Sequence, residues 1–468
     1  MEQRSICLIN DSFPPVTDGV ANAVVNYAKI LTENGKKATV VTPAYPGADD
    51  SQFDFPIVRY PSVDLTKLVG YHAGFPFSSQ TLETLVERDF DLIHCHCPVT
   101  SAMLARALRD RIHVPLVFTY HTKFDIDIAN AIKGKLLQEE AKKVLVDNIT
   151  ACDEVWTVSH GAGENLKSLG YQGDYLVMPN GVDFPKGRVD ESLVREVTTD
   201  FDLPENIPMF LFVGRMMWYK GLRIIVDALK LLQAGGQDFR MVFIGGGTDA
   251  AEVQEYAKPL GSKCIFTGAI SQRETLRAWY CRADLFLFPS SYDTNGLVVR
   301  EAAASDLAAV LIQGSCAAEG VTDGVDGFLI EENAGAMASK LQEICKHPEC
   351  MAQVGRQAGE RLYLSWGDAV KRARERYGVV MENYRMGRYE DHHKPMDGVL
   401  NAQGTMMDAL ARVRDLGDGL AERYREGWEE HKEEFEERRE ERRGERRSIR
   451  SELKQKGEAL WQKLDRYL

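Results

Sequence analysis

The chain lacks two features that would point directly to a partner: a long apolar run and an excess of positive charge. Its 468 residues contain 57 Lys or Arg against 70 Asp or Glu, a formal net charge of −13. Because the phosphate backbone selects basic surfaces, this balance argues against DNA or RNA as a partner. The N-terminal MEQRSICLIN runs from charges into a strand pattern without the apolar region of a signal peptide. We therefore expect a cytoplasmic protein.

Cysteine is sparse as well, and its nine residues follow no regular framework of the kind that disulfide-rich secreted proteins show. HCHC at 94–97 looks like a metal cluster. Alternation along a strand, however, puts His94 and His96 on one face and Cys95 and Cys97 on the other, which argues against a four-ligand zinc site. We expect reduced thiols and no metal.

Short β-rich runs alternate with helical patterns along most of the chain, as in parallel sheets that are covered on both faces. The first set of runs is SICLIND, KATVVTP, DLIHCHCP, VPLVFTYH, EVWTVSH and YLVMPNGV. After FDLPENIP the pattern restarts with MFLFVGR, RMVFIGGG, CIFTGA, LFLFPSS and AAVLIQG. This predicts an α/β protein with two doubly wound, Rossmann-like domains, 1–204 and 205–361, which face a cleft at the carboxyl ends of their strands.

The stretch 285–304, LFLFPSSYDTNGLVVREAAA, has the pattern of a strand, a loop and a helix start. Asp293 and Glu301 stand eight positions apart across the loop and the first helical turns. Gly296 permits close approach of a ligand, and the free N–H groups of the new helix attract an anion. Two carboxylates beside an anion site suit a negatively charged, hydroxyl-rich ligand. An ordinary βα turn with a solvated Glu301 is the competing interpretation.

The second domain opens with VGRMMWYKG, in which Gly214 and Arg215 leave a strand and Lys220 lies where a helix begins. Two cations and a helix N-terminus at one strand end predict a pyrophosphate clamp that needs no metal. A surface basic pair is the alternative. The glycine run that starts at Gly245 and the segment FTGAIS, which contains Ala269, add two more loops for backbone contacts to a flat base.

In the first domain, two strand ends carry candidate contacts. Gly19 lies in DSFPPVTDGVANAVVNYAKIL, where its N–H is available to a phosphate, although a lone glycine is more often a plain tight turn. His121 ends VPLVFTYH at the carboxyl edge of a strand, where ligand contacts gather, and a structural histidine is the alternative. Asp125 and Asp127 form an Asp-x-Asp pair, but it enters a helical pattern, which argues against a metal site.

Several of these motifs occur together in order, with PNGVD at 179–183 and DGVDGFLI at 323–330. Residues 4–388 thereby resemble the retaining glycosyltransferases of family 4, and DGVANAVVNYA and YHTKFD are most similar to the bacterial enzymes that glucosylate diacylglycerol. The resemblance implies the GT-B fold and metal-independent transfer of a hexose from a nucleotide-diphosphate sugar, UDP-glucose, to a lipid or glycan acceptor. No cofactor beyond the donor is implied. Residues 362–388 look like the helix that crosses back to the first domain.

The same resemblance assigns roles to the candidate residues. Arg215 and Lys220 would hold the diphosphate, and Glu301 would bind the ribose hydroxyls. Asp293 would lie by the sugar hydroxyls, with His121 on the first-domain side of the reacting sugar and Gly19 near the phosphates. The other expected donor contacts are Gly214, Gly245, Ala269, Asn295, Gly296 and Leu297.

Four departures from the family pattern fall around the sugar pocket. Asp293 replaces the usual Glu, Asn295 stands where an aromatic is common, SDLAAV replaces Ser-Gly-x-Pro-Val, and Ser315-Cys316 replaces a paired glycine. These changes concern the identity of the sugar and the rate more than the nucleotide. A nucleotide-sugar epimerase is one alternative, because such epimerases share this fold. A catalytically weak binding or scaffold protein is another, suggested by the altered sugar pocket and the long charged tail.

Residues 389–468 form a predicted helical, charged tail. The segment 426–445 has ten Glu against five Lys or Arg, whereas 446–468 has seven Lys or Arg against three Asp or Glu. Apolar residues of the second segment fall close to one helical face: Ile449, Leu453, Leu460, Trp461, Leu464 and Leu468. This pattern is typical of a helix on an anionic membrane surface, here the inner face of the plasma membrane. A helix packed on the enzyme or on a second subunit is the alternative.

Overall fold

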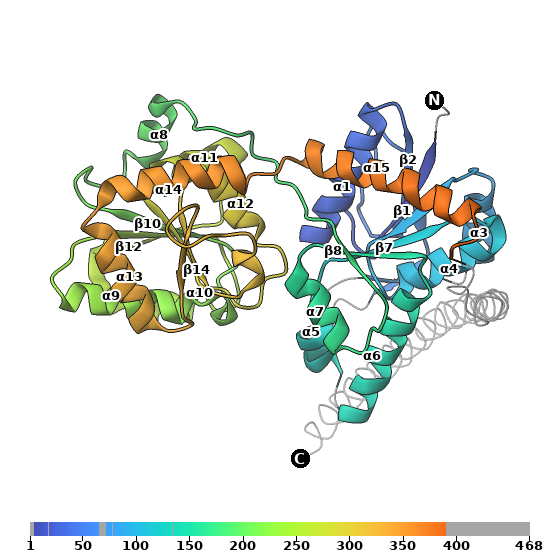
Figure 1. The fold of residues 1–468 in the computed structure, drawn as a ribbon, viewed down its shortest axis with the longest axis horizontal. Helices are drawn as coiled ribbons and strands as arrows, with labels where there is room; N and C mark the ends of the chain where they lie inside the picture. The colour runs from blue at the N-terminus through green and yellow to red at the C-terminus, as the bar shows by residue number, and fades with distance from the viewer. Residues whose placement is uncertain (1–3, 17, 65–71, 77, 133, 390–468) are drawn as a thin grey trace, which may run out of the picture. The chain divides into compact units, whose positions relative to one another are not determined.

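The computed structural model describes residues 4–16, 18–64, 72–76, 78–132 and 134–389 (Figure 1). All of the described residues belong to one compact unit. The predicted tail therefore lies almost entirely outside the described residues. Among the helices that are described, none is long and apolar enough to cross a membrane.

The first sheet is parallel throughout and has seven strands in the order β3-β2-β1-β6-β7-β8-β9. Its strands are β1 (Ser5–Ile9), β2 (Lys37–Pro43), β3 (Ile57–Tyr60), β6 (Leu92–Cys95), β7 (Leu116–Tyr120), β8 (Glu154–Thr157) and β9 (Leu176–Val177). The central strands are buried along their whole length, as expected for strands with helices on both faces. A separate antiparallel pair joins β4 (Ser62–Asp64) to β5 (His72–Gly74).

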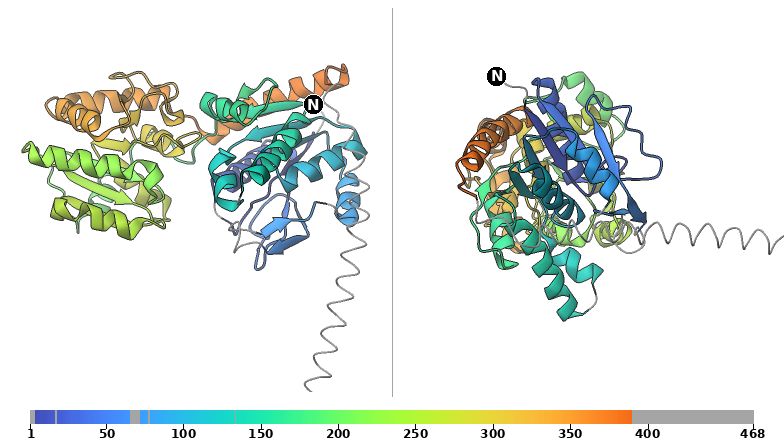
Figure 2. Two further views of the ribbon diagram at one scale, coloured as in Figure 1. Left: turned by 90° about the horizontal axis from the view of Figure 1, so that it is seen from below. Right: turned by 90° about the vertical axis from the view of Figure 1, so that its right-hand side faces the viewer.

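Helices connect the strands of this sheet and cover it on both sides (Figure 2). They are α1 (Gly19–Glu33), α3 (Ser79–Val86), α4 (Thr100–Ile112), α5 (Phe124–Ala131), α6 (Lys135–Thr150) and α7 (His160–Ser168). The start of α1 shows how the sequence sets a boundary. The Asp18 carboxylate accepts hydrogen bonds from the N–H groups of Val20 and Ala21, at 2.8 and 2.7 Å, and so caps the helix.

The second sheet has six parallel strands in the order β12-β11-β10-β13-β14-β15. They are β10 (Met209–Val213), β11 (Arg240–Ile244), β12 (Cys264–Gly268), β13 (Leu285–Phe288), β14 (Ala309–Ile312) and β15 (Phe328–Ile330). The helices around it are α8 (Glu191–Thr198), α9 (Leu222–Ala234), α10 (Ala250–Ala257), α11 (Arg273–Arg282), α12 (Leu297–Ala304), α13 (Ala334–Cys345) and α14 (Pro348–Arg361), with 3₁₀ turns η1 (Trp218–Lys220), η2 (Lys258–Lys263) and η3 (Cys316–Ala318). The expected α/β fold with two parallel sheets is confirmed.

The apolar core of the second sheet begins earlier in the chain than the predicted boundary at 204. Phe184 is fully buried in this core, and Val197, Phe201 and Leu203 pack against it. Helix α8 also packs on α11. A boundary drawn where the strand pattern restarts therefore falls too late, because the connecting segment has apolar residues that the second core buries.

Helix α15 (Trp366–Arg385) packs on the first sheet and on α1, although it follows α14 of the second. Ser365 caps its N-terminus, with its hydroxyl accepting from the N–H of Asp368 at 3.0 Å. Tyr377 is buried and stacks on Trp156, with ring centroids 5.4 Å apart. Arg376 donates two hydrogen bonds to the Glu154 carboxylate, at 2.8 and 2.6 Å. These contacts attach the helix to the first sheet.

Candidate active site

Most of the expected site residues follow the carboxyl ends of parallel strands, where ligands bind in open α/β sheets. His121 follows β7, Gly214 and Arg215 follow β10, Gly245 follows β11, Ala269 follows β12, and the loop with Asp293 follows β13. The helix predicted after Gly296 is α12, which begins at Leu297. Lys220 was expected at the start of a helix. It instead ends the turn η1, and helix α9 begins two residues later at Leu222.

Lys220 and Asp293 form an ion pair, with 2.6 Å between Nζ and Oδ1. Their side chains are only 12% and 19% exposed. The Lys220 ammonium also lies over the rings of Tyr219 and Phe288, 5.3 and 5.9 Å from their centroids. The second carboxylate oxygen of Asp293, Oδ2, is buried and has no hydrogen-bond partner. A buried acceptor of this kind suits a ligand hydroxyl, because leaving it unpaired is costly.

Glu301 lies on α12 with its side chain 14% exposed, which does not fit the solvated carboxylate of the competing interpretation. Its Oε2 accepts from the Tyr280 hydroxyl at 3.2 Å, and its Oε1 lies 3.4 Å from Nη1 of Arg273. Burial raises the pKa of Glu301, and the charge of Arg273 opposes this shift. Arg273 also pairs with Asp183. The Glu301 carboxylate is therefore held by Tyr280 at one oxygen and by Arg273 at the other.

Two of these partners, Arg273 and Tyr280, were not predicted from the sequence. Both lie on α11, which follows the segment FTGAIS. The motif PNGVD was noted in the sequence, and its Asp183 is the second ion-pair partner of Arg273. Nothing in the spacing of α11 indicates that these side chains reach Glu301, which is 28 residues further along the chain from Arg273.

Arg215 remains available to a ligand. Its side chain is exposed, and its guanidinium donates to the Tyr219 hydroxyl at 3.1 Å. Gly245 has a φ of 139°, and a Cβ there would lie 1.9 Å from the Gly214 carbonyl oxygen. The two loops after β10 and β11 thus approach each other at distances that only glycine permits.

Gly296 also has a conformation that favours glycine, with a φ of 58° at the start of α12. A Cβ added there would lie 2.9 Å from the Cα of Ala317. This glycine therefore has a structural reason that is independent of any ligand. At Gly19 an added Cβ would meet nothing within 4 Å, and the Asp18 carboxylate already occupies the N–H groups of Val20 and Ala21. The predicted phosphate contact at Gly19 stays a prediction.

His121 is buried, and both of its ring nitrogens face protein groups. Nε2 lies 2.9 Å from Nδ1 of His96, and Nδ1 lies 3.4 Å from the side-chain amide nitrogen of Asn180. Burial lowers the pKa of His121 to about 3, so the imidazole is neutral at physiological pH. His94 and His96 lie on one side of β6, as the alternation predicts, with ring centroids 4.0 Å apart.

Residues after β13 contact residues after β7, β8 and β9. The Tyr292 hydroxyl is 2.9 Å from the Lys123 carbonyl and 3.1 Å from the Asp125 carboxylate. In the amide orientation that satisfies both of its ends, Asn295 donates to the carbonyl of Val158 and accepts from the N–H of Asn180, at 3.2 and 3.3 Å. Among the described residues, no group of three or more His, Cys, Asp or Glu side chains is arranged to hold a metal ion.

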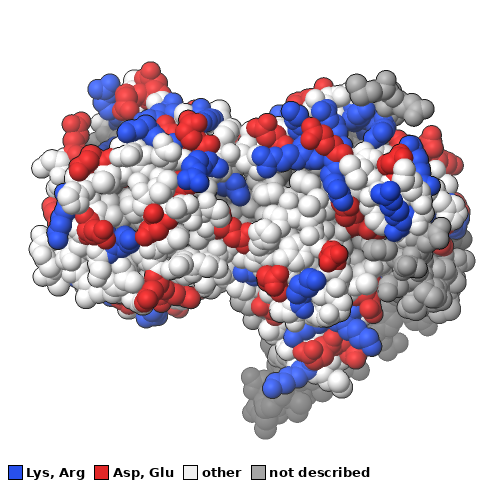
Figure 3. Space-filling model, viewed as in Figure 1, with Lys and Arg blue, Asp and Glu red and all other residues white. Residues whose placement is uncertain are grey.

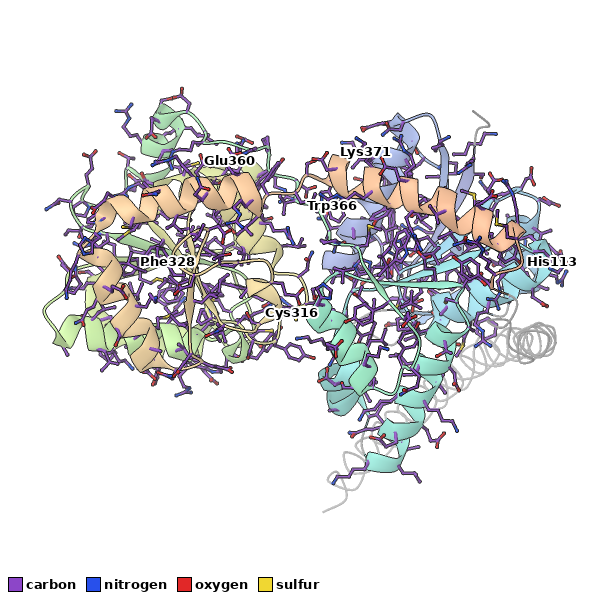
Figure 4. All side chains as sticks on the ribbon, in the orientation of Figure 1. His113, Cys316, Phe328, Glu360, Trp366 and Lys371 are labelled. Atoms are coloured by element: carbon purple, nitrogen blue, oxygen red, sulfur yellow. The ribbon has the colours of Figure 1, made fainter. Side chains whose placement is uncertain are left out.

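Glu319, which follows β14 of the second sheet, caps helix α7 of the first sheet. This role was not predicted from the sequence. Its carboxylate accepts hydrogen bonds from the N–H groups of His160 and Gly161, at 2.7 and 2.5 Å. Figure 4 labels Cys316 on the same loop, and a Cβ added at Gly161 would lie 2.5 Å from its sulfur. Asn295 and Cys316, which depart from the family pattern, therefore lie where loops of the second sheet contact loops and helix α7 of the first.

Comparison with known families agrees with the fold and with the order of the strand-end motifs. A model described as Glycosyltransferase Family 4 matches residues 17–185, and one described as Glycosyl transferases group 1 matches residues 207–347. The chain belongs to the family 4 glycosyltransferases and has their GT-B fold. It is accordingly a glycosyltransferase.

Similar proteins include two alpha-monoglucosyldiacylglycerol synthases. The one from Streptococcus pneumoniae is 23% identical over 306 residues, 64% of this chain and 69% of that protein. The one from Acholeplasma laidlawii is 23% identical over 367 residues, 75% of this chain and 91% of that protein. A GDP-mannose-dependent alpha-mannosyltransferase from Corynebacterium glutamicum is 26% identical over 366 residues, 74% of this chain and 83% of that protein.

A solved structure with the same fold is that of Anabaena Alr3699/HepE in complex with UDP. Its TM-score is 0.66 at 17% sequence identity, and the alignment covers 80% of this chain and all of that chain. The sucrose-phosphate synthase of Thermosynechococcus elongatus aligns with a TM-score of 0.64 at 21% identity, over 81% of this chain and 99% of that one. At these identities the likeness concerns the fold.

Proposed function

We propose that this glycosyltransferase moves glucose from UDP-glucose to a diacylglycerol-type lipid, with retention of configuration and without a metal ion. The observation that carries the proposal is the buried pair of Lys220 and Asp293, whose free Oδ2 is an unsatisfied acceptor beside a cation. A nucleotide sugar has both groups that such a pair would bind: an anionic diphosphate and sugar hydroxyls. Two relatives named as alpha-monoglucosyldiacylglycerol synthases support the choice of sugar and acceptor.

The chemistry follows from the charges at the strand ends. Breaking the bond between the anomeric carbon and the phosphate oxygen leaves extra negative charge on the nucleotide diphosphate. Arg215, Lys220 and the N-terminus of α12 would stabilise that charge as it develops, because fixed cations and N–H groups need no reorganisation at the moment of reaction. Glu301 would bind the ribose, and Asp293 and His121 the sugar. No protein nucleophile is required, and the acceptor hydroxyl would attack on the face that the leaving group vacates.

The decisive experiment combines donor and acceptor screening. The full chain is incubated with UDP-glucose, UDP-galactose or GDP-mannose, each with a lipid extract or with soluble glycans, and the products are identified by mass spectrometry. We expect a glucosylated diacylglycerol from UDP-glucose. GDP-mannose belongs in the panel because one relative is named for it. Transfer from another donor, or to a soluble glycan alone, would contradict the proposal.

The same assay separates two alternatives. An epimerase would convert the donor sugar without any acceptor, so the donor is analysed after incubation alone. A scaffold protein would turn over no donor at all.

Metal independence has its own test. A clamp of Arg215 and Lys220 supplies the positive charge that Mg²⁺ brings to other phosphate sites. Turnover should therefore persist in EDTA. If EDTA abolishes turnover and Mg²⁺ or Mn²⁺ restores it, the clamp is insufficient and Asp125 with Asp127 must be reconsidered as metal ligands.

A lipid acceptor would bring the enzyme to a membrane, and the basic segment 446–468 is the proposed contact. Each basic residue near an anionic surface contributes about 1 kcal/mol. Sedimentation with liposomes compares the intact chain with a chain that ends at Arg443. Binding should require anionic lipid, weaken with salt and disappear on truncation, while turnover of a soluble donor persists. Equal sedimentation of both chains would instead assign the tail to packing or assembly.

A further inference from the structure

Three histidines lie together between β6 and β7, and only one of them has a predicted role. His94 bonds with both nitrogens to protein groups: Nδ1 is 2.6 Å from the Tyr377 hydroxyl and Nε2 is 2.7 Å from Oγ1 of Thr119. His96 differs, because Nδ1 contacts His121 at 2.9 Å while Nε2 is buried without a partner. His94 is therefore fully used by the fold, and His96 is not.

The direction of the hydrogen bonds between these groups follows from their chemistry. An amide nitrogen only donates, so Asn180 requires Nδ1 of His121 to accept. Neutral His121 then carries its proton on Nε2 and donates it to Nδ1 of His96. His96 in turn carries its own proton on Nε2, the atom that has no partner. With the Asn180 amide in this orientation, a single arrangement of protons satisfies every contact of His121.

The surroundings keep both rings neutral. Burial lowers the pKa of His96 well below its ordinary value, and the neighbouring His94 and His121 lower it further. Tyr27 on α1 packs against His96, with ring centroids 5.5 Å apart, and Tyr377 on α15 contacts the neighbouring His94. No described carboxylate hydrogen-bonds to either ring, so no imidazolium is stabilised here.

We propose that His96 is a positioning residue for glycosyl transfer: it holds the Nε2–H of His121 and thereby presents Nδ1 to the donor sugar as a hydrogen-bond acceptor. This inference rests on the proposed function, since His121 is assigned there to the sugar. The 3.4 Å contact to Asn180 is long, and a ligand hydroxyl would take its place. An unpartnered buried N–H on His96 is unfavourable for folding alone, so the arrangement calls for a functional reason.

The proposal also defines the group on the sugar that meets His121. An unprotonated imidazole nitrogen accepts a hydrogen bond, so the sugar group beside it must carry a hydrogen to donate, as a hydroxyl does. A carboxylate or sulfonate at the same position offers only acceptors and would be rejected, because it would leave two lone pairs facing each other. Donors that carry a hydroxyl there should be used in preference to the corresponding uronic-acid donors.

The test uses a pair of substitutions at one position. His96→Asn keeps an oxygen acceptor close to where Nδ1 stands, whereas His96→Leu removes the acceptor at similar size. Tyr377→Phe is the matched control, because it alters the partner of His94 and leaves the His96 to His121 contact intact. Each full-length variant is first checked for folding by circular dichroism and thermal unfolding.

Two readouts are compared. The first is the His121 Nε2–H signal in NMR of ¹⁵N-histidine-labelled protein, assigned with His121→Gln. The second is kcat and KM for UDP-glucose. We expect the signal in the native chain, in His96→Asn and in Tyr377→Phe, and its loss in His96→Leu. We expect kcat of His96→Leu to fall about tenfold, as for loss of roughly 1.4 kcal/mol, with KM for the donor within about twofold.

Other outcomes overturn the inference. A proton on Nδ1 of His121 in the native chain would reverse the assigned direction. Equal losses of kcat in the Asn and Leu variants would mean that packing matters and the acceptor does not, and an unchanged kcat in His96→Leu would mean that neither does. The NMR arm needs no turnover, so it tests His96 even if UDP-glucose is not the donor. Failure of the proposed function and failure of this inference are thereby distinguishable.

Discussion

Among the candidate residues, those of the second sheet include two ion pairs, whereas the two histidines at the strand ends of the first sheet are neutral and buried. Lys220 with Asp293 and Arg273 with Glu301 represent the first kind. His96 with His121 represents the second. Charged pairs suit a group whose charge changes during reaction, while neutral hydrogen bonds suit recognition of hydroxyls. We infer that the cations of the second sheet serve the leaving group, while Asp293 of that sheet and His121 of the first serve the sugar.

Neither set of groups produces a basic surface. Figure 3 shows Lys and Arg side chains interspersed with Asp and Glu over the visible face, without a broad patch of one sign. The charges that matter for the proposed reaction are few and partly buried. Substitutions at the paired residues should therefore have far larger effects than those at exposed ones.

Lys220→Ala should have the largest effect. It removes a cation from the proposed diphosphate site and leaves the Asp293 carboxylate without its partner. Loss of one such electrostatic contact lowers kcat by about 10²–10³-fold. Steady-state kinetics with UDP-glucose would measure this. Lys186→Ala is the control, because Lys186 pairs with Glu360 at the surface with side chains 39% and 67% exposed, and it should leave kcat unchanged. If Lys220→Ala and Asp293→Asn lose activity additively in the double variant, the two residues do not act as a pair.

Glu301→Gln should weaken binding of free UDP about 10- to 100-fold, since charge-assisted hydrogen bonds contribute about 1.5–3 kcal/mol. Titration calorimetry with UDP measures the affinity directly. Asp293→Asn serves as the comparison, because Asp293 is assigned to the sugar, and it should keep UDP affinity while lowering kcat. Equal losses of UDP affinity in both variants would contradict the division between the two carboxylates.

The neutral histidines should make the fold sensitive to acid. The pKa of His121 is lowered to about 3, while an unfolded chain has an ordinary histidine pKa of about 6.5. As pH falls through about 6.5, the unfolded state takes up a proton that the folded state refuses, so stability decreases towards low pH. Between pH 7 and pH 5 this histidine should cost about 2 kcal/mol.

Urea unfolding at the two pH values measures that cost. His121→Asn should reduce the difference in the free energy of unfolding between pH 7 and pH 5 by about 2 kcal/mol. His347→Asn is the control, since its side chain is 63% exposed and solvent reaches it in both states. An unchanged difference in His121→Asn would mean that this histidine is not held neutral by burial.

Glu319→Ala should have the smallest effect of the four. The carboxylate caps α7 through the N–H groups of His160 and Gly161, and loss of a helix cap costs about 0.5–2 kcal/mol. The change should appear as a lower urea midpoint with an unchanged slope. Glu360→Ala, at an exposed ion pair, should change the midpoint less. Equal shifts of the urea midpoint in both variants would mean that the Glu319 cap adds no more stability than an exposed ion pair.

Apart from β3 and β15, the sequence by itself determined the strands of the two parallel sheets. Apolar runs of four to seven residues with intervening helical periodicity become the strands of two parallel sheets, because burial on both faces demands continuous apolar residues. Asp293, Glu301, Arg215 and Lys220 were recognisable because each stands just beyond such a run or in the helix that follows it. Strand ends of a parallel sheet share one edge, so their position along the chain predicts a common region.

Only the tertiary structure decided the partners of these residues. Arg273 reaches Glu301 from 28 positions away, and Asp293 pairs with Lys220 across 73 positions. His96 meets His121 because β6 and β7 are neighbours in the sheet. No local pattern encodes such contacts, since they depend on strand order and on the side-chain geometry that packing selects. Burial and pairing together set the charge of each group and the direction in which it hydrogen-bonds, and these are the properties that the proposed reaction uses.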